Sequence, residues 1–451
     1  MLLKPTNFSS SGKLRLLLSF LILVTICGCS TQTDYFEEGA KAKIPFDTYI
    51  SEEDAAKDPL ILALVICSQP SKTLEGVLHN DLCAIVFQQV AVGWAAQDRK
   101  EFANWAFLKS IEYARRTRQK SGSRLRGISE SCLDSGCYEE AVEASRYLRV
   151  EDRARVLAEV AANLARNGEQ DKARELLEEA EDRLQANVQA GGSAKQRAYR
   201  AIAVAHFYLQ ESELTAEAQE LGSRFDPTWP PVVAIRNYIE VADMYRQCSQ
   251  LEVAKKYARR AETLCRKHRD EQMTVLTAAL MSRLGEQGTA EALIQKLVGR
   301  TRDPAQVAQG YGRIGRPDLA LKFLKESTDE VRARGIYLTS SYFETVEDKQ
   351  SVVALVRNLD AGHKDWQMLQ AVADLCARTG DSRRAQRYYL ASLAAYQRDW
   401  PELWHNSQQR AFVLANYGRE MAESDLAADS RSLKLYAGLT KSYNWPQELK
   451  L

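Results

Sequence analysis

Two stretches of the chain repeat one pattern: LAEVAANLARNGEQDKARELLEEA (157–180) and LQAVADLCARTGDSRRAQRYYLAS (369–392). When they are aligned at Gly168 and Gly380, apolar residues recur at the same places before the glycine, and an alanine recurs five residues after it. Residues at these spacings share one face of a helix. Each stretch is therefore predicted to form two helices joined by a turn, a hairpin whose apolar face must be covered by a neighbouring hairpin.

The same pattern can be followed from near residue 80 to near residue 440. The alanines of the predicted second helices are Ala103, Ala141, Ala173, Ala218, Ala254, Ala292, Ala320, Ala354, Ala385 and Ala427. Their nine intervals cover 324 residues and average 36. Tandem hairpins of this length predict an all-α solenoid of about ten hairpins that forms a superhelix, although length alone would suggest about three domains.

Small and β-branched residues mark where the helices are expected to touch. Adjacent Val and Ala residues in a first helix are expected to face an Ala of the second helix, because small side chains let the two helices approach closely. A glycine in the turn supplies the left-handed conformation that ends the first helix. The predicted packing residues are Val160, Ala161, Ala173, Val241, Ala242, Ala254, Val307, Ala308, Ala320, Val372, Ala373 and Ala385.

This alternation of small and large residues resembles the tetratricopeptide repeat family, whose period is about 34 residues. The resemblance covers about 360 of the 451 residues. It is degenerate, since Ala161 and Ala242 stand where the family has Gly, and the family's Trp in the first helix is absent. The resemblance implies a scaffold that binds a segment of a partner protein on a concave face built from the first helices.

The N-terminus carries a second recognisable signal. Three basic residues, Lys4, Lys13 and Arg15, precede the apolar run LLLSFLILVTI (16–26). The run has 11 residues, whereas a helix that spans a membrane needs about 20. A run of this length is typical of a secretory signal peptide.

The residues that follow, Ile26-Cys27-Gly28-Cys29, resemble the bacterial lipobox, although Cys27 is unusual at its tolerant position. The resemblance implies that residues 1–28 are removed as a lipoprotein signal peptide and that Cys29 is lipidated. Because Ser30 follows the cysteine, it also implies an outer-membrane address facing the periplasm. An ordinary cleaved signal or a short membrane anchor remains the alternative.

Composition divides the mature chain into three parts. Residues 29–57 are polar and are predicted to form the lipidated N-terminus and a flexible tether. Residues 58–224 and 225–451 are predicted to hold N-terminal and C-terminal repeats, the latter ending in a capping hairpin. The boundary is placed at GSRFDPTWPP (222–231), whose three prolines are expected to break or kink the array.

Charge and motifs argue against several function classes. Lys and Arg number 61 and Asp and Glu number 60, for a net charge of +1, which favours neither nucleic acid nor anionic lipid as a partner. The five histidines do not pair at metal-ligand spacing, and no phosphate loop or catalytic signature occurs in the sequence. We therefore expect no cofactor, metal, catalytic residue or small-molecule substrate. An envelope enzyme and a purely structural spacer are the alternatives to a scaffold.

Two basic runs are the candidate partner-binding surface. The first contains Arg115, Arg116, Arg118, Arg124 and Arg126, and the second contains Lys255, Lys256, Arg259 and Arg260. Such runs are commonly solvated helix faces. The functional interpretation is a basic concave strip that takes acidic peptide tails, or that lies near anionic lipid or polysaccharide.

The cysteines do not form a recognisable disulfide framework. Besides Cys27 and Cys29 there are seven, an odd number with irregular spacing. Cys132 and Cys137 flank one predicted turn, and whether they pair is left open by the sequence.

Overall fold

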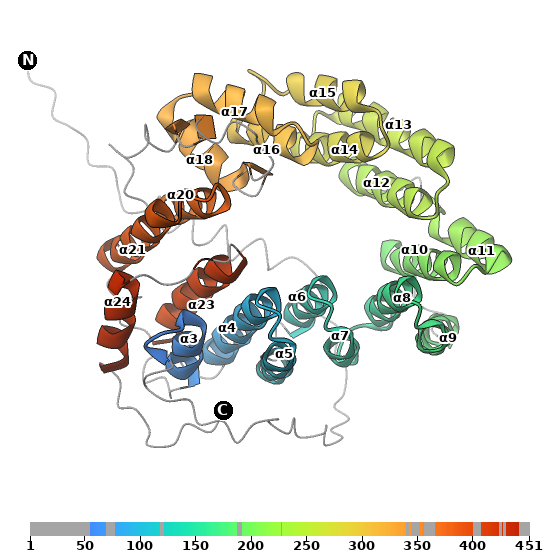
Figure 1. Cartoon of the computed structure of the whole chain (residues 1–451). Helices are drawn as coiled ribbons and strands as arrows, with labels where there is room; N and C mark the ends of the chain where they lie inside the picture. Colours follow the sequence, from blue (N-terminus) through green and yellow to red (C-terminus); the bar gives the residue numbers. More distant parts are fainter. Residues whose placement is uncertain are drawn as a thin grey trace, which may run out of the picture. The chain divides into compact units, whose positions relative to one another are not determined.

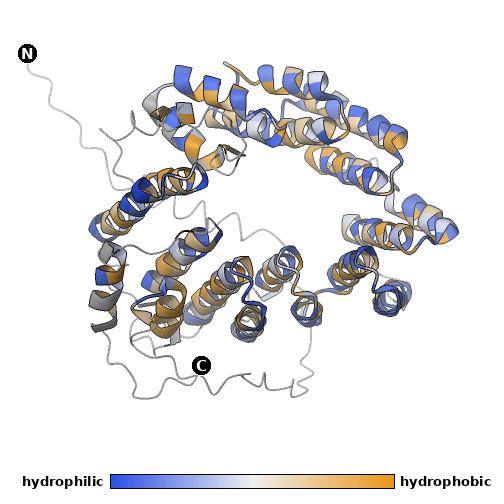
Figure 2. Ribbon diagram, viewed as in Figure 1, coloured by the Kyte–Doolittle hydropathy of each residue, from blue (hydrophilic) through white to orange (hydrophobic). Residues whose placement is uncertain are grey.

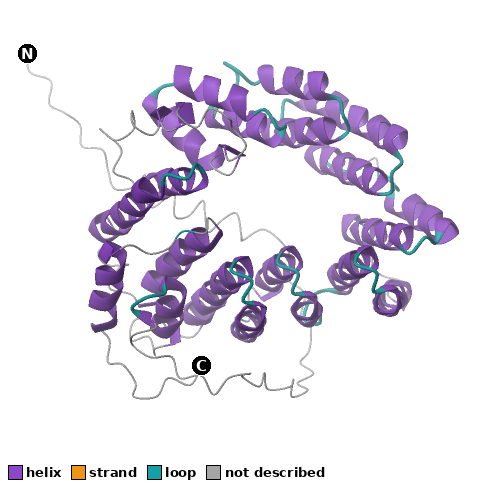
Figure 3. Cartoon of the chain, viewed as in Figure 1, coloured by secondary structure: helices purple, strands orange, loops and turns teal. Residues whose placement is uncertain are grey.

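The computed structural model is all-α. It describes residues 55–68, 77–117, 121–186, 192–226, 228–339, 342–343, 351–352, 354–355, 366–399, 407–423, 426 and 430–441. These residues form 20 helices and no strand (Figures 1 and 3). The predicted fold class, an all-α solenoid, is confirmed.

Eight helical hairpins are complete in this part of the chain. Their first helices are α4 (Val77–Ala96), α6 (Ser121–Asp134), α8 (Val150–Arg166), α10 (Ser193–Tyr208), α12 (Pro231–Gln247), α14 (Glu271–Arg283), α16 (Ala305–Arg313) and α20 (Trp366–Arg378). The matching second helices are α5 (Lys100–Arg115), α7 (Tyr138–Ser145), α9 (Gln170–Ala186), α11 (Ser212–Gly222), α13 (Leu251–His268), α15 (Gln287–Gln295), α17 (Pro317–Glu326) and α21 (Ser382–Asp399). Four further helices are α3 (Pro59–Ser68), α18 (Asp329–Thr339), α23 (Ser407–Glu423) and α24 (Ser430–Lys441).

First helices pack on first helices from one hairpin to the next. Contacts join α4 to α6, α6 to α8, α8 to α10, α10 to α12, α12 to α14 and α14 to α16, and the series continues through α18, α20 and α23. Each second helix packs on the first helix of its own hairpin. Apolar residues alternate with polar ones around the helices (Figure 2), as expected where each helix covers its neighbour on one side only.

The succession of contacts closes on itself, which the sequence did not predict. Helix α23 packs against α3 and α4 (Figure 1). Arg419 of α23 donates a 2.6 Å hydrogen bond from Nη1 to Oε1 of Gln89 in α4, 330 residues earlier. The side chain of Leu60 in α3 lies against both Gly93 and Gly418. Helix α23 therefore covers α3 and the first hairpin.

The turns show why the glycines recur. The amide of Gly168 donates to the carbonyl of Ala165, and the amide of Glu169 donates to that of Leu164; this pair of bonds caps the C-terminus of a helix. Gly380 ends α20 with the same two bonds, and both glycines have φ above +80°. At the equivalent place after α10, Gln210 adopts φ +64° without the freedom of a glycine.

All twelve predicted packing residues are buried. Two of the repeat alanines are not, since Ala292 and Ala354 are exposed. In α15 the buried residues are Ala290, Leu293 and Ile294 instead. The pattern places this helix correctly but shifts its packing face, because GTAEA contains two alanines that are two residues apart.

The connection at 222–231 joins helices that touch. Helix α10 contacts α12 across it, and Arg200 donates to the backbone carbonyl of Gly222 and to the side chains of Asn237 and Glu240. A hydrophobic core with members from Ala55 to Tyr436 runs through both sides. Whether 224/225 separates two functional units stays a prediction.

The predicted targeting signal falls outside the described residues. Residues 1–54 are not described, so the signal peptide, the lipidation of Cys29 and most of the tether stay predictions. Among the helices that are described, none is both long and apolar enough to cross a membrane.

Candidate functional site: an arginine pocket on the first helices

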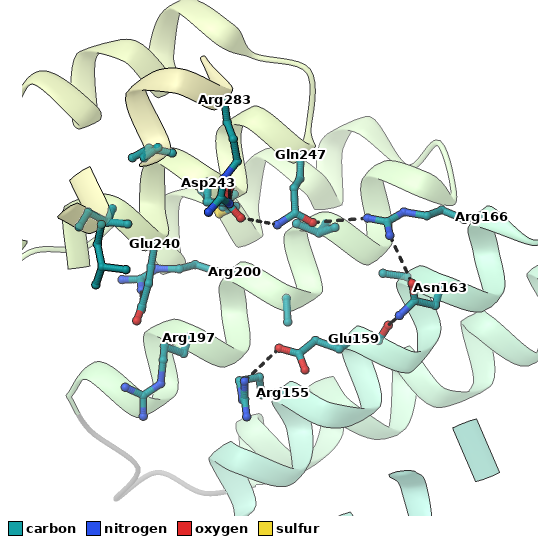
Figure 4. Close-up of a pocket in the computed structure, with 17 residues that line it drawn as sticks. Arg155, Glu159, Asn163, Arg166, Arg197, Arg200, Glu240, Asp243, Gln247 and Arg283 are labelled. Atoms are coloured by element: carbon teal, nitrogen blue, oxygen red, sulfur yellow. Dashed lines mark hydrogen bonds and ion pairs between the residues drawn. The ribbon is translucent and has the colours of Figure 1, made fainter. Parts of the chain in front are cut away.

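Helices α8, α10, α12 and α14 line a cavity of about 420 Å³ (Figure 4). Its apolar lining comes from Ala162, Ala201, Val204, Ile239, Met244, Leu276 and Leu280. Its polar lining comes from Arg155, Glu159, Asn163, Arg166, Arg197, Arg200, Glu240, Asp243, Gln247 and Arg283. We call this cavity the arginine pocket.

Helical spacing brings these side chains to one surface. On α8, Arg155, Glu159 and Asn163 follow one another at intervals of four residues, so they lie on one face. On α12, Asp243 and Gln247 are spaced in the same way. The packing residues of α8, such as Val160 and Ala161, lie on another face and are buried. Each first helix thus packs with one face and contributes to the pocket with another.

Hydrogen bonds hold the side chain of Arg200 in place in the lining of the pocket. It is buried, and its Nε donates to the carbonyl oxygen of Gly222 over 2.9 Å while its terminal nitrogens contact Asn237 and Glu240. Burial lowers the pKa of Arg200 to about 10, against the opposing effect of Glu240. The guanidinium therefore stays charged at neutral pH and is matched by Glu240.

Two further arginines of the pocket are also paired with carboxylates. Arg155 donates to Glu159 over 3.2 Å and to Glu130 over 2.9 Å. Arg283 contacts Asp243 at 3.4 Å. Burial raises the pKa of Glu159, and the charge of Arg155 opposes this rise.

Arg166 and Arg197 are not neutralised in this way. Arg166 donates to the amide oxygens of Asn163 and Gln247, at 3.2 and 3.4 Å (Figure 4). Its guanidinium lies 4.2 Å from the ring centroid of Tyr208. Within the described part of the chain, no carboxylate oxygen lies within 4.0 Å of a nitrogen of either arginine. The pocket holds five arginines against three carboxylates, and the excess of two positive charges resides on these two side chains.

The described residues of the first predicted basic run lie at the C-terminal end of α5 and on α6. Arg116, the residue after α5, pairs with Glu112 of that helix. The guanidinium of Arg115 lies 4.1 Å from the ring centroid of Tyr147. Arg118 lies outside the described residues.

The other two arginines of that run, Arg124 and Arg126 on α6, pair with Asp81 at 3.0 Å and Asp152 at 2.7 Å. Both partners lie on neighbouring first helices. These ion pairs join successive hairpins, which gives the two arginines a structural contact.

The second predicted run lies on α13, a second helix. Lys255 pairs with Glu252 and Arg259 with Glu286, while Arg260 lies over the rings of Tyr238 and Tyr257. Lys256 is exposed.

The two runs are separated by hairpins α8–α9 and α10–α11. None of the eight described residues of these runs lines the arginine pocket. The structure does not bring the runs together into one strip along the first helices.

Sequence reasoning missed the arginine pocket because its charges are spread over four hairpins. No single helix of the pocket shows a basic run, and on α8 and α12 acidic residues stand between the basic ones. A usable signal was present, since Arg155, Arg166, Arg197, Arg200 and Arg283 all fall on predicted first helices. Collecting the polar residues of first helices separately from those of second helices would have found it.

Outside the pocket, the surroundings of His206 and Glu420 shift the pKa values of these two groups. His206 on α10 contacts Glu181 at 2.8 Å and Glu211 at 2.7 Å through its two ring nitrogens. Burial alone would lower the pKa of His206, but the hydrogen bonds to both glutamates raise it. The imidazole thus joins α9, α10 and the turn before α11.

Glu420 on α23 is the second of these groups. Burial raises the pKa of Glu420 to about 7, with Arg419 acting against the rise and Asp374 adding to it. Its Oε2 atom has no hydrogen-bond partner among the described residues. No cluster of three or more His, Cys, Asp or Glu suited to a metal ion was found in that part of the chain.

Comparison with known proteins adds little. No family model matches the chain, and no curated protein matches it. A solved structure described as "Circular tandem repeat protein with novel repeat topology and enhanced subunit contact surfaces" is similar at 15% identity, over 81% of this chain and 74% of that chain, with a TM-score of 0.15. A likeness at this TM-score carries no argument. The helices and contacts described above show by themselves that the chain is a helical repeat protein.

Proposed function

We propose that the protein is a lipid-anchored interaction scaffold of the bacterial cell envelope that binds an acidic segment of a partner protein in the arginine pocket. The observation that carries the proposal is the pair Arg166 and Arg197, two guanidinium groups without a carboxylate partner in a concave site. A guanidinium can bind a carboxylate through two parallel hydrogen bonds. Two such groups, on neighbouring helices, favour a ligand with at least two carboxylates.

The chemistry of the lining favours a peptide as that ligand. The pocket mixes apolar residues with the charged ones, and successive first helices continue the surface on both sides. Helical repeat arrays commonly bind extended segments along such a surface. The degenerate tetratricopeptide-like pattern supports the same mode of binding.

Binding of an acidic peptide tests the proposal. We would titrate the full chain into a fluorescein-labelled hexaglutamate peptide and follow fluorescence anisotropy. Because a hydrogen bond to a charged group contributes about 1.5–3 kcal/mol, Arg166→Gln and Arg197→Gln should each weaken binding about 10- to 100-fold. Arg300→Gln is the matched control, because it removes the same charge from an exposed residue outside the pocket and outside both basic runs. An equal loss of affinity in all three variants would mean that attraction to net charge, and not the pocket, holds the peptide.

The membrane anchor is tested separately. Cys29→Ala removes the predicted lipidation site. We expect the wild-type chain in the membrane fraction, because several acyl chains anchor a protein firmly. The variant has none of these chains and is expected in the soluble periplasmic fraction. Membrane retention of the variant would refute the lipid anchor and leave peptide binding untouched.

One observation favours an envelope enzyme as the second candidate. Glu159 lies in the wall of the pocket with a raised pKa, which is a property of general acids. Glu159→Gln separates the candidates: the scaffold keeps or gains affinity for the hexaglutamate peptide, whereas a hydrolase loses activity on purified peptidoglycan. Activity of the wild-type chain on peptidoglycan that vanishes in Glu159→Gln would overturn the scaffold.

A further inference from the structure

Two thiols meet where the array closes. Cys67 lies near the end of α3 and Cys83 lies in α4, and both side chains are fully buried. Their Sγ atoms are 3.0 Å apart. A disulfide bond has a length of about 2.05 Å, so a movement of about 1 Å would bring the sulfurs into bonding distance.

We infer that Cys67 and Cys83 form a structural disulfide that ties α3 to α4. The two sulfur atoms already point at each other across the contact between the helices. All four of Cys67, Cys83, Cys132 and Cys137 are free buried thiols in the structure. The second pair, whose pairing the sequence left open, differs in its contacts: the sulfur of Cys137 contacts the carbonyl oxygen of Ser135 at 3.8 Å, whereas the sulfur of Cys83 contacts that of Cys67.

A disulfide oxidant, such as oxidised glutathione or an oxidised thiol–disulfide oxidoreductase, accepts the electrons. The Cys83 thiolate attacks one sulfur of the oxidant and releases a first thiolate. The Cys67 thiolate then attacks the Cys83 sulfur of the mixed disulfide and releases the second. One disulfide is formed and one is reduced, and the two released thiolates take up the two protons lost by the cysteines.

His79 favours Cys83 as the first nucleophile. Its Nε2 lies 3.7 Å from the Cys83 sulfur, one helical turn away on α4. An imidazole has a pKa of about 6.5 before it is buried, and burial lowers the pKa of His79 further, so the neutral form is present at neutral pH and can accept the thiol proton. In the folded chain burial raises the pKa of the Cys67 thiol well above its usual range. The disulfide is therefore expected to form during folding, before α3 packs on α4 and buries the Cys67 thiol.

The bond would act on the closure of the array. Helix α3 has 10 residues, too few to be stable alone, and it contacts both α4 and α23. Fixing α3 to α4 completes the surface that receives α23. In the cell the bond requires an oxidising compartment, and in this respect it rests on the export that the proposed function includes.

The experiment uses the full chain refolded from denaturant in a buffer of reduced and oxidised glutathione. The chain is then unfolded, its free thiols are alkylated with iodoacetamide, and its peptides are mapped by mass spectrometry. We expect a linked peptide pair that contains Cys67 and Cys83, lighter by two hydrogen atoms than the two reduced peptides and lost on reduction. Cys248, which is equally buried in the fold, should be alkylated. Alkylation of Cys67 and Cys83 to the same extent as Cys248 would overturn the inference.

Thermal unfolding gives a second measurement. A phosphine reductant should lower the unfolding temperature of the wild-type chain and of Cys248→Ser, but not that of Cys83→Ser. An equal shift in all three chains would also refute the bond. If Cys83→Ser does not fold, the unfolding temperature of the wild-type chain with and without reductant still shows whether a disulfide stabilises it. Neither measurement depends on location or on peptide binding, so failure here and failure of the proposed function are distinguishable.

Discussion

Closure of the array depends on two glycines that leave no room for a side chain. A Cβ atom at Gly418 would lie 2.7 Å from Cδ2 of Leu60 and 3.2 Å from the backbone nitrogen of Leu60. A Cβ atom at Gly93 would lie 2.9 Å from Cδ1 of Leu60 and 3.2 Å from Cα of Arg419. The side chain of Leu60 can rotate, but backbone atoms can move only if α3, α4 and α23 separate. Gly418→Ala is therefore predicted to loosen the closure.

The expected magnitude follows from two opposing contributions. Ala instead of Gly inside a helix stabilises by about 1 kcal/mol, and overpacking of a tight contact destabilises by about 1–3 kcal/mol. Gly418→Ala should thus lower the free energy of unfolding by up to about 2 kcal/mol. Gly127→Ala on α6 is the control, because a Cβ atom there meets nothing within 4 Å. It should raise the free energy of unfolding by about 1 kcal/mol.

Hydrogen exchange measured by mass spectrometry is the decisive assay, because a repeat array need not unfold in one step. Gly418→Ala should speed amide exchange in α3, α4 and α23 and leave exchange in α12 and α13 unchanged. Gly127→Ala should speed none of them. If the exchange of α3 and α23 in Gly418→Ala equals that in the wild-type chain, and the variant is stabilised like Gly127→Ala, the closing contact does not exist in solution and the reasoning fails.

Three further predictions concern the turns and the buried titratable groups. Gly168→Ala should lower the free energy of unfolding by about 1 kcal/mol, and Gln210→Gly should raise it by a similar amount, because the backbone is left-handed at both positions. Urea denaturation measures both changes. If both variants changed the free energy of unfolding in the same direction, the argument would be contradicted. Between pH 4.5 and about 7, Glu420 keeps a proton in the native state that it loses in the unfolded state. The free energy of unfolding of the wild-type chain should therefore fall by up to about 3 kcal/mol as pH rises over this range. Glu420→Gln should remove this fall in thermal unfolding curves recorded over the same range. The raised pKa of His206 contributes stability that is complete below 6.5 and is lost as pH rises through the folded pKa; His206→Gln should remove that loss in the same melts extended to alkaline pH, and an unchanged profile would refute the coupling to its two glutamates.

The hairpins could be predicted because their signal is local. Val160 and Ala161 recur relative to Gly168 as Val372 and Ala373 do relative to Gly380, and helix geometry alone turns that spacing into a shared face. The left-handed turn follows from the glycine by the same local argument.

The closure and the pocket could not be predicted because their signals are not local. Gly93 and Gly418 look in the sequence like any other glycine inside a helix, and their meaning depends on Leu60 lying between them. Whether the ends meet depends on small rotations between successive hairpins, summed over the whole array. The pocket has the same origin, since Arg166 and Arg197 come to line one cavity only when α8 packs on α10.

Closure changes what the pocket can do. In an open solenoid each terminal hairpin exposes an apolar face that needs a polar cap, and rotations between hairpins accumulate toward the ends. Here α3, α4 and α23 cover one another, so the hairpins that carry the pocket are held from both directions along the chain. The spacing between Arg166 and Arg197 is then fixed before a ligand arrives. A site that is already ordered loses less conformational entropy on binding, so the glycines at the closing contact contribute to recognition at helices they do not touch.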